Sequence, residues 1–212
     1  MKIKELCSYV LVGLLAGCVP SLHPLYTEKE LILEEELSGL WSEEKQIWKF
    51  EADKGEKSYE LTILDEDLKS GKFIAHLVKL DDSLFLDLFP GELELQANNF
   101  YKIHLLPAHT FLKVDQIKPT LKMRIMNHEE LQKMLKDDPN LLKHEIIKDN
   151  RLVLTASTKE LQQFMKKYGK HKDLFGDAVE FKRLQLGEPD EDNEDKHSEE
   201  ARENESADDS DQ

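Results

Sequence analysis

The sequence predicts a mainly β protein, an antiparallel barrel or sandwich with helical insertions. Three observations support this prediction. Between residues 41 and 114, apolar residues come in short β-type runs separated by turn residues. Further along, two segments combine helix-capping patterns with apolar stripes at helical spacing. A last β-type run follows at residues 178–186, so the helices are predicted to be insertions among strands.

The predicted strands of the first part are short and joined by tight turns. Acidic or glycine-containing turns at residues 53–55, 65–67 and 81–82 separate them, and Pro107 marks a further turn. This spacing is typical of an antiparallel meander that closes into a barrel or a sandwich. The predicted strands cover residues 46–51, 57–64, 71–80, 83–89, 100–106, 110–115 and 120–126.

Two helices are predicted between these strands and the last one. The first lies near residues 127–137, with Asn127 as its N-cap and a proline soon after its end. A hairpin with strands at residues 145–148 and 151–155 follows. The second helix lies near residues 157–168, where a serine and a glutamate form a capping box and a glycine ends the helix.

The N-terminus has the features of a bacterial export signal. Two lysines precede an apolar stretch at residues 7–17, which is too short to span a hydrocarbon core of about 30 Å as a helix. Residues 15–18, Leu-Ala-Gly-Cys, resemble the lipobox of bacterial lipoproteins, in which small residues precede a lipid-modified cysteine. An ordinary signal peptide or membrane anchor with a chance cysteine is the alternative. The lipobox predicts a signal peptide at residues 1–17 and a mature chain that begins at Cys18.

The lipobox resemblance implies a lipoprotein of the cell envelope. Cys18 would carry a diacylglycerol thioether and a further acyl chain such as palmitate, so the membrane is a predicted partner. Val19 stands where lipoproteins kept in the inner membrane often have aspartate, which favours the outer membrane in a cell that has one. Residues 18–38 are predicted to be a tether and N-terminal segment. Because Cys7 would leave with the signal, the mature chain would have no free thiol, and no cofactor is predicted.

The net charge of −15 is unevenly distributed. The tail at residues 187–212 has 13 acidic and two basic residues, so it carries −11. Since the tail has almost no large apolar residue, it is predicted to be disordered. Residues 18–186 carry only −5, and no stretch supplies the basic surface that nucleic acids require. The sequence therefore excludes a nucleic-acid partner and predicts one domain at residues 39–186.

Two details resemble the lipocalin-like (calycin) barrels. The tripeptide at residues 39–41 resembles the G-x-W of the first strand in that superfamily, and Arg183 resembles the basic residue of the last strand that packs over this tryptophan. The resemblance implies that Trp41 and Arg183 close one end of the barrel, although the first predicted helix departs from the superfamily's simple meander. Separately, the runs 21–26 and 85–90 resemble a group of bacterial lipoproteins with no known activity.

The predicted hairpin about residues 81–82 places a histidine opposite an aspartate. With a two-residue loop, His76 pairs with Asp87, and both side chains share one face among apolar neighbours. Such a pair can have shifted pKa values and can orient a base or a ligand. The simpler interpretation is a structural pair in which two half-buried polar groups satisfy each other's hydrogen bonds.

His104 and His109 flank the turn at Pro107 and are further ligand-binding candidates. A turn can bring the two imidazoles together as metal ligands or at a barrel mouth, whereas the simpler interpretation is two surface histidines. No metal site is predicted, because zinc requires three or four ligands.

These features favour a non-catalytic carrier or sensor that binds a small apolar or amphipathic molecule in the barrel, with groups such as His76 and Asp87 fixing its orientation. The alternative is an interaction module with a filled barrel that docks an envelope protein. A His/Asp hydrolase is least favoured, because the sequence has no phosphate-binding loop, nucleophile elbow, zinc-protease motif or dinucleotide fingerprint. The size of the inward side chains separates the first two hypotheses.

Overall fold

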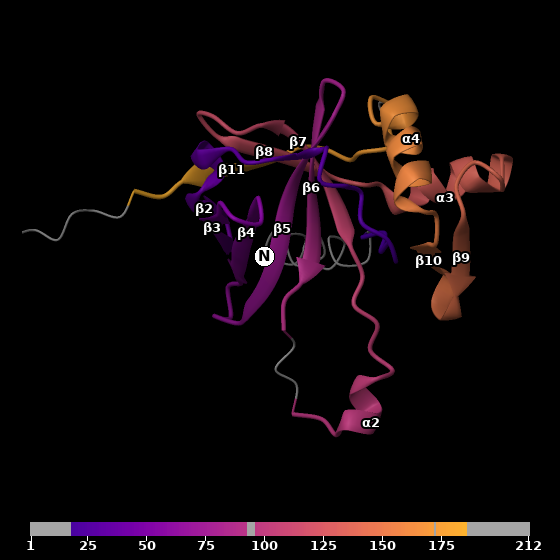
Figure 1. Cartoon of the computed structure of the whole chain (residues 1–212), viewed down its shortest axis with the longest axis horizontal. Coiled ribbons are helices and arrows are strands. Elements are labelled where there is room, and N and C mark those ends of the chain that lie inside the picture. The colour runs from indigo at the N-terminus through magenta and orange to yellow at the C-terminus, as the bar shows by residue number, and fades with distance from the viewer. Residues whose placement is uncertain (1–17, 93–95, 172, 186–212) are drawn as a thin grey trace, which may run out of the picture.

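The computed structural model describes residues 18–92, 96–171 and 173–185 (Figure 1). The predicted signal peptide (1–17) and the predicted disordered tail (187–212) lie outside these residues. Within the described ranges the chain is mainly β, with eight antiparallel strands closed into a barrel and three α-helices. The predicted fold class is confirmed, and the barrel is the correct one of the two architectures that the strand pattern allowed.

The barrel is an up-and-down meander. Strands β2 to β8 pair in the order of the sequence, and β11 closes the barrel by pairing with both β8 and β2. The short strand β1 (Leu31–Ile32) pairs with β5. The eight barrel strands are β2 (Gly39–Glu43), β3 (Gln46–Asp53), β4 (Ser58–Leu64), β5 (Ser70–Leu80), β6 (Ser83–Pro90), β7 (Thr110–Gln116), β8 (Leu121–Ile125) and β11 (Val179–Arg183).

Between β8 and β11 the chain leaves the barrel and forms a helical insertion beside it (Figure 1). The insertion consists of α3 (His128–Asp137), β9 (His144–Ile147), the 3₁₀ turn η2 (Lys148–Asn150), β10 (Arg151–Leu154) and α4 (Thr158–Tyr168). Both helices begin as predicted: the Asn127 side chain accepts from two backbone N–H groups of α3, and Ser157 forms the capping box of α4. No helix in the described ranges is long and apolar enough to cross a membrane.

The predicted strand at residues 100–106 is wrong. The segment forms a short helix, α2 (Asn99–Lys102), and an exposed loop. The Asn98 side chain accepts from the backbone N–H of Tyr101, which fixes a helical turn. β6 already pairs with β5 and β7, so the closed barrel leaves no strand edge beside this segment. The apolar residues that suggested a strand are exposed, Phe100 at 74% and Leu106 at 77%.

The interior of the barrel is filled by large apolar side chains. They come from alternate positions of the strands, as the twofold period of β-structure requires. The short 3₁₀ helix η1 (Glu35–Leu37) adds Leu37, which is fully buried with them. The largest interior strand side chains that are at most 1% exposed are Trp41, Phe50, Tyr59, Leu61, Leu77, Leu86 and Leu121.

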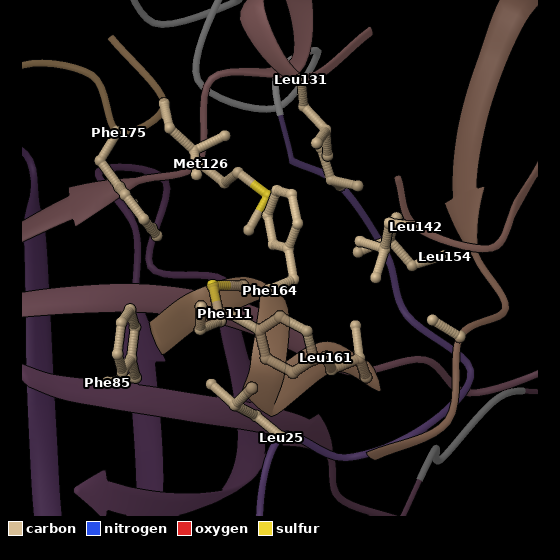
Figure 2. Packing of buried hydrophobic residues seen from close by; sticks show 14 of the residues in the cluster. Leu25, Phe85, Phe111, Met126, Leu131, Leu142, Leu154, Leu161, Phe164 and Phe175 are labelled. Atoms are coloured by element: carbon tan, nitrogen blue, oxygen red, sulfur yellow. The ribbon is translucent and has the colours of Figure 1, made fainter. Parts of the chain in front are cut away.

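A second apolar core covers the outer face of β5, β6 and β7. Val78, Phe85 and Phe111 point out of the barrel and pack with residues of the N-terminal segment and the insertion (Figure 2). Figure 2 shows Leu25 and Phe164 within this cluster. Because both of its faces are covered, β6 is a nearly continuous apolar run.

The first described residues are part of this second core. Val19 and Leu25, from the predicted tether, are buried in it. Ser21 forms an antiparallel bridge with His109 and a parallel bridge with Leu154. The chain is therefore packed into the folded domain within a few residues of Cys18.

Candidate functional site

A histidine and an aspartate are paired across the β5–β6 hairpin. The two-residue turn at Asp81 and Asp82 sets the register, with Asp81 in the left-handed region at φ 52°. His76 is therefore directly opposite Asp87, as predicted from the sequence. Both positions alternate with the inward-facing residues, so the pair lies on the outer face of the barrel.

Asp87 is fully buried and has two partners, neither of which is His76. One carboxylate oxygen, Oδ1, is 2.7 Å from Nδ1 of His109, a buried residue just before β7. The other, Oδ2, accepts from the backbone N–H of Leu25 at 2.7 Å. His109 is held in turn by two backbone hydrogen bonds with Ser21, of 2.9 and 2.8 Å. Asp87 thus joins the barrel to the N-terminal segment through a buried, charge-assisted network.

His76 is half-buried beside this network. Its ring stacks on the ring of Tyr26, with 4.2 Å between centroids. Burial lowers the pKa of the His76 imidazole below its usual 6.5; the Asp87 carboxylate opposes this shift and His109 adds to it. The ring is therefore neutral at pH 7. Its buried Nδ1 has no hydrogen-bond partner among the described residues.

Tyr26, His76, Asp87 and His109 form the histidine–aspartate cluster. Two surface hollows lie near this cluster, both outside the barrel. The larger has a volume of about 1290 Å³ and is lined by Tyr26, His76 and Ile74 on one side and by the charged β3–β4 turn on the other. The smaller, of about 590 Å³, is lined by Ile74, Phe89 and Leu106 among others. Phe89 also contacts the ring of His109, at 4.6 Å between centroids. His76 and Tyr26 are thus the members of the cluster that line the larger hollow.

The serine next to this cluster has its hydroxyl hydrogen-bonded elsewhere. The hydroxyl of Ser21, the serine bridged to His109, donates to the carbonyl oxygen of His23 at 2.8 Å. It is therefore engaged away from the imidazole that a nucleophilic serine would require as its base. Among the described residues, no three or more His, Cys, Asp or Glu side chains form a group that could hold a metal ion. The geometry fits a buried structural junction.

The predicted closure residues meet at one end of the barrel. Arg183 pairs with Trp41 between β11 and β2, and its guanidinium carbon is 4.6 Å from the centre of the Trp41 ring. The guanidinium also donates to the carbonyl oxygens of Glu36 and Ser38. Gly39 has φ of +125°, and a Cβ there would be 2.7 Å from Nη1 of Arg183. The glycine of the G-x-W tripeptide therefore leaves room for the arginine.

His104 and His109 have different surroundings. His104 is exposed in the loop after α2, where its ring contacts the edge of Phe100. His109 is buried against Asp87. Three of the four side chains of the cluster, His76, Asp87 and His109, were candidates from the sequence. Tyr26 was not a candidate, and the contact between His109 and Asp87 was not predicted. Those contacts connect distant parts of the chain and depend on the unknown path of the segment between β6 and β7.

No family model matches this chain, and its comparison with curated proteins and with solved structures gives no match. The closed eight-stranded antiparallel barrel is compatible with a lipocalin-like fold.

Proposed function

We propose that this protein is an exported lipoprotein, anchored by acyl groups on Cys18, whose filled barrel is a non-catalytic interaction module of the cell envelope. Val19, next to the anchor, supports placement at the outer membrane in a cell that has one. The packing of the barrel interior favours an interaction module over a carrier of a small molecule.

A carrier that buries a small molecule needs a cavity of several hundred Å³. In this barrel, rings and long aliphatic side chains fill the corresponding space. Trp41, Phe50 and Tyr59 are each at most 1% exposed, and Phe50 and Tyr59 make an edge-to-face contact at 6.0 Å. Interiors packed in this way leave few voids larger than a water molecule. The barrel therefore serves as a rigid scaffold, and recognition falls to its surface.

The histidine–aspartate cluster supports a non-catalytic role. Asp87 uses both oxygens to hold His109 and the N-terminal segment, and Ser21 is bonded elsewhere. A hydrolase with this dyad would need a nucleophile within hydrogen-bond reach of the imidazole.

A second candidate function is binding of a small amphipathic molecule outside the barrel. The larger surface hollow favours it, because Tyr26 and Ile74 offer apolar surface on one side and Lys54 and Glu56 offer charges on the other. The half-buried His76 lines the same side of the hollow as Tyr26, on whose ring it stacks.

The two cysteines of the chain provide a matched test of the anchor. Cys18→Ala should abolish acylation, seen by mass spectrometry of the N-terminal peptide, and should release the protein from the membrane fraction. Cys7→Ala, inside the predicted signal peptide, should leave both unchanged. An unacylated wild-type protein, or a Cys18→Ala protein that stays in the membrane fraction, would contradict the proposal.

Native mass spectrometry of the mature protein from its own membranes separates the two functions. If the protein is an interaction module, its measured mass should equal that of the polypeptide plus its acyl chains. A reproducible additional small molecule would instead support ligand binding. Loss of that molecule in Ile74→Asp, with retention in Trp41→Phe, would place it in the outer hollow.

A further inference from the structure

The segment between β6 and β7 exposes an unusual amount of apolar surface. Five large apolar residues occur within seven positions after Asn99, and all five are exposed. Their exposed fractions range from 37% for Leu105 to 77% for Leu106. Figure 1 shows this segment extending away from the barrel, with α2 at its far end. The five residues are Phe100, Tyr101, Ile103, Leu105 and Leu106.

The same segment is free of acidic residues in an otherwise acidic chain. Residues 96–114 contain no aspartate or glutamate, although the chain has 44 of them in 212 residues. Lys102 is its cation next to the exposed rings. Apolar side chains with a neighbouring lysine and a tyrosine are the composition that suits the interface of a bilayer, where rings and long stems are buried and polar tips stay hydrated.

This apolar segment lies near the anchor. Ser21 and His109 exchange two backbone hydrogen bonds. Ser21 is three residues from Cys18, and His109 is three residues from Leu106. Three residues span at most about 11 Å, and hydrogen-bonded strand partners are about 5.5 Å apart. The Cα atoms of Cys18 and Leu106 are therefore at most about 27 Å apart. Because Val19 is buried, the chain has little slack between the anchor and the folded domain.

The β9–β10 hairpin lies on the other side of the N-terminal segment. Leu154 is hydrogen-bonded to Pro20 and Leu22, and the hairpin tip exposes Ile146 at 50% and Ile147 at 44%. In Figure 1 this tip and α2 extend toward the same side of the molecule. Exposed apolar side chains thus flank the path of the chain that leads to Cys18.

We propose that residues 99–106 insert into the interface of the bilayer to which Cys18 is anchored, forming a second membrane contact that fixes the orientation of the domain. This inference rests on the proposed lipid anchor. The α2 end of the barrel faces the bilayer, and the opposite end, with the β5–β6 turn, faces away. A free loop of this composition would be an exposed apolar patch with no function, which soluble surfaces rarely carry.

Tryptophan fluorescence of the mature acylated protein in vesicles tests the insertion. The vesicles contain phosphatidylethanolamine and phosphatidylglycerol, with or without bromine on the acyl chains. Phe100→Trp places a reporter at the segment, whereas the native Trp41 and Trp48 are buried in the barrel and provide a constant background. Asp82→Trp is the matched control, because Asp82 has a side chain 92% exposed at the opposite end of β6.

The Phe100→Trp protein should show emission at shorter wavelength in vesicles and should be quenched by brominated chains. The Asp82→Trp protein should show neither change. Equal quenching of the two variants, or none in Phe100→Trp, would overturn the proposal. The vesicles contain no other protein, so docking of loop 99–106 on a partner protein alone would give that negative result.

A thiol label provides an independent measurement. The mature acylated chain would have no free thiol, so Leu106→Cys can carry a single nitroxide. If the segment inserts, the nitroxide should be highly accessible to oxygen and poorly accessible to a water-soluble nickel chelate. The reverse pattern would overturn the insertion. Mass spectrometry of the same samples distinguishes the failures. An unlipidated Cys18 overturns the anchor and with it this inference, whereas a lipidated protein with a water-exposed label overturns the insertion alone.

Discussion

The two faces of β6 are equally buried but are covered in different ways. Leu86 points into the barrel, and the other buried residues of its cluster come from the barrel strands and η1. Its neighbour Phe85 points outward and is covered by the insertion, with Phe175 at 6.0 Å between ring centroids. One face is therefore buried by closure of the barrel, and the other depends on segments that are added to it.

The two faces also differ in polarity. The inner cluster consists of apolar residues, whereas the outer face holds the fully buried Asp87, which is covered by the buried His109. Barrel strands use their backbone N–H groups in the ladders between them, so they have few donors to offer a buried carboxylate. An irregular segment has free donors, and Leu25 provides one to Asp87. The polar cluster therefore marks where an irregular segment is attached to a closed barrel.

The largest expected effects come from truncating these two neighbours. Leu86→Ala should lower the free energy of unfolding by about 2–5 kcal/mol and Phe85→Ala by about 3–5 kcal/mol, because each leaves a cavity in a packed core. The location of the damage should differ. Hydrogen exchange should rise throughout the barrel strands in Leu86→Ala, and in α4 and the segment after Cys18 in Phe85→Ala.

Lys79→Ala, an exposed position on the neighbouring strand, is the control and should change the unfolding free energy by less than about 0.5 kcal/mol. Identical exchange patterns in the two core variants would show that barrel and insertion unfold as one unit. That result would remove the distinction between the two faces.

Asp87→Ala should have the next largest effect, about 3 kcal/mol, because it leaves His109 and the Leu25 N–H buried without their acceptor. The loss should be concentrated in the N-terminal segment. Exchange of the Leu25 amide and denaturant unfolding are the measurements.

Asp87→Asn is the conservative comparison, since its carbonyl oxygen can still accept from Leu25. It should retain more of the Leu25 protection than Asp87→Ala does. If Asp87→Ala leaves this amide as protected as in the wild type, the carboxylate does not hold the N-terminal segment.

Local features of the fold were predictable from the sequence, because their physical causes are local. The capping residues Asn127 and Ser157 begin both helices as predicted, and the two-residue turn at Asp81 sets the predicted register of His76 and Asp87. The Trp41–Arg183 contact agrees in geometry with the lipocalin resemblance.

The wrong and the missed predictions concern where apolar and polar residues lie in the folded chain. Residues 100–106 are apolar without being buried, so composition predicted a strand where the closed sheet has no free edge. The partnership of Asp87 with His109 and Leu25 joins positions 22 and 62 residues apart. Only the packed fold determines such contacts.

The smallest expected effect is a pH dependence at His76. Its pKa in the folded protein lies below the usual 6.5 because the ring is buried, so on acidification the unfolded chain takes up a proton before the folded one does. The associated stability is present above the unfolded pKa and is lost as the pH falls toward the folded value. Over about pH 8 to 5, wild-type stability should fall more steeply than that of His76→Gln. If the wild-type stability falls no more steeply than that of the variant, the folded protein tolerates a protonated His76 ring. The polar groups of the outer face would then not restrict the charge of His76.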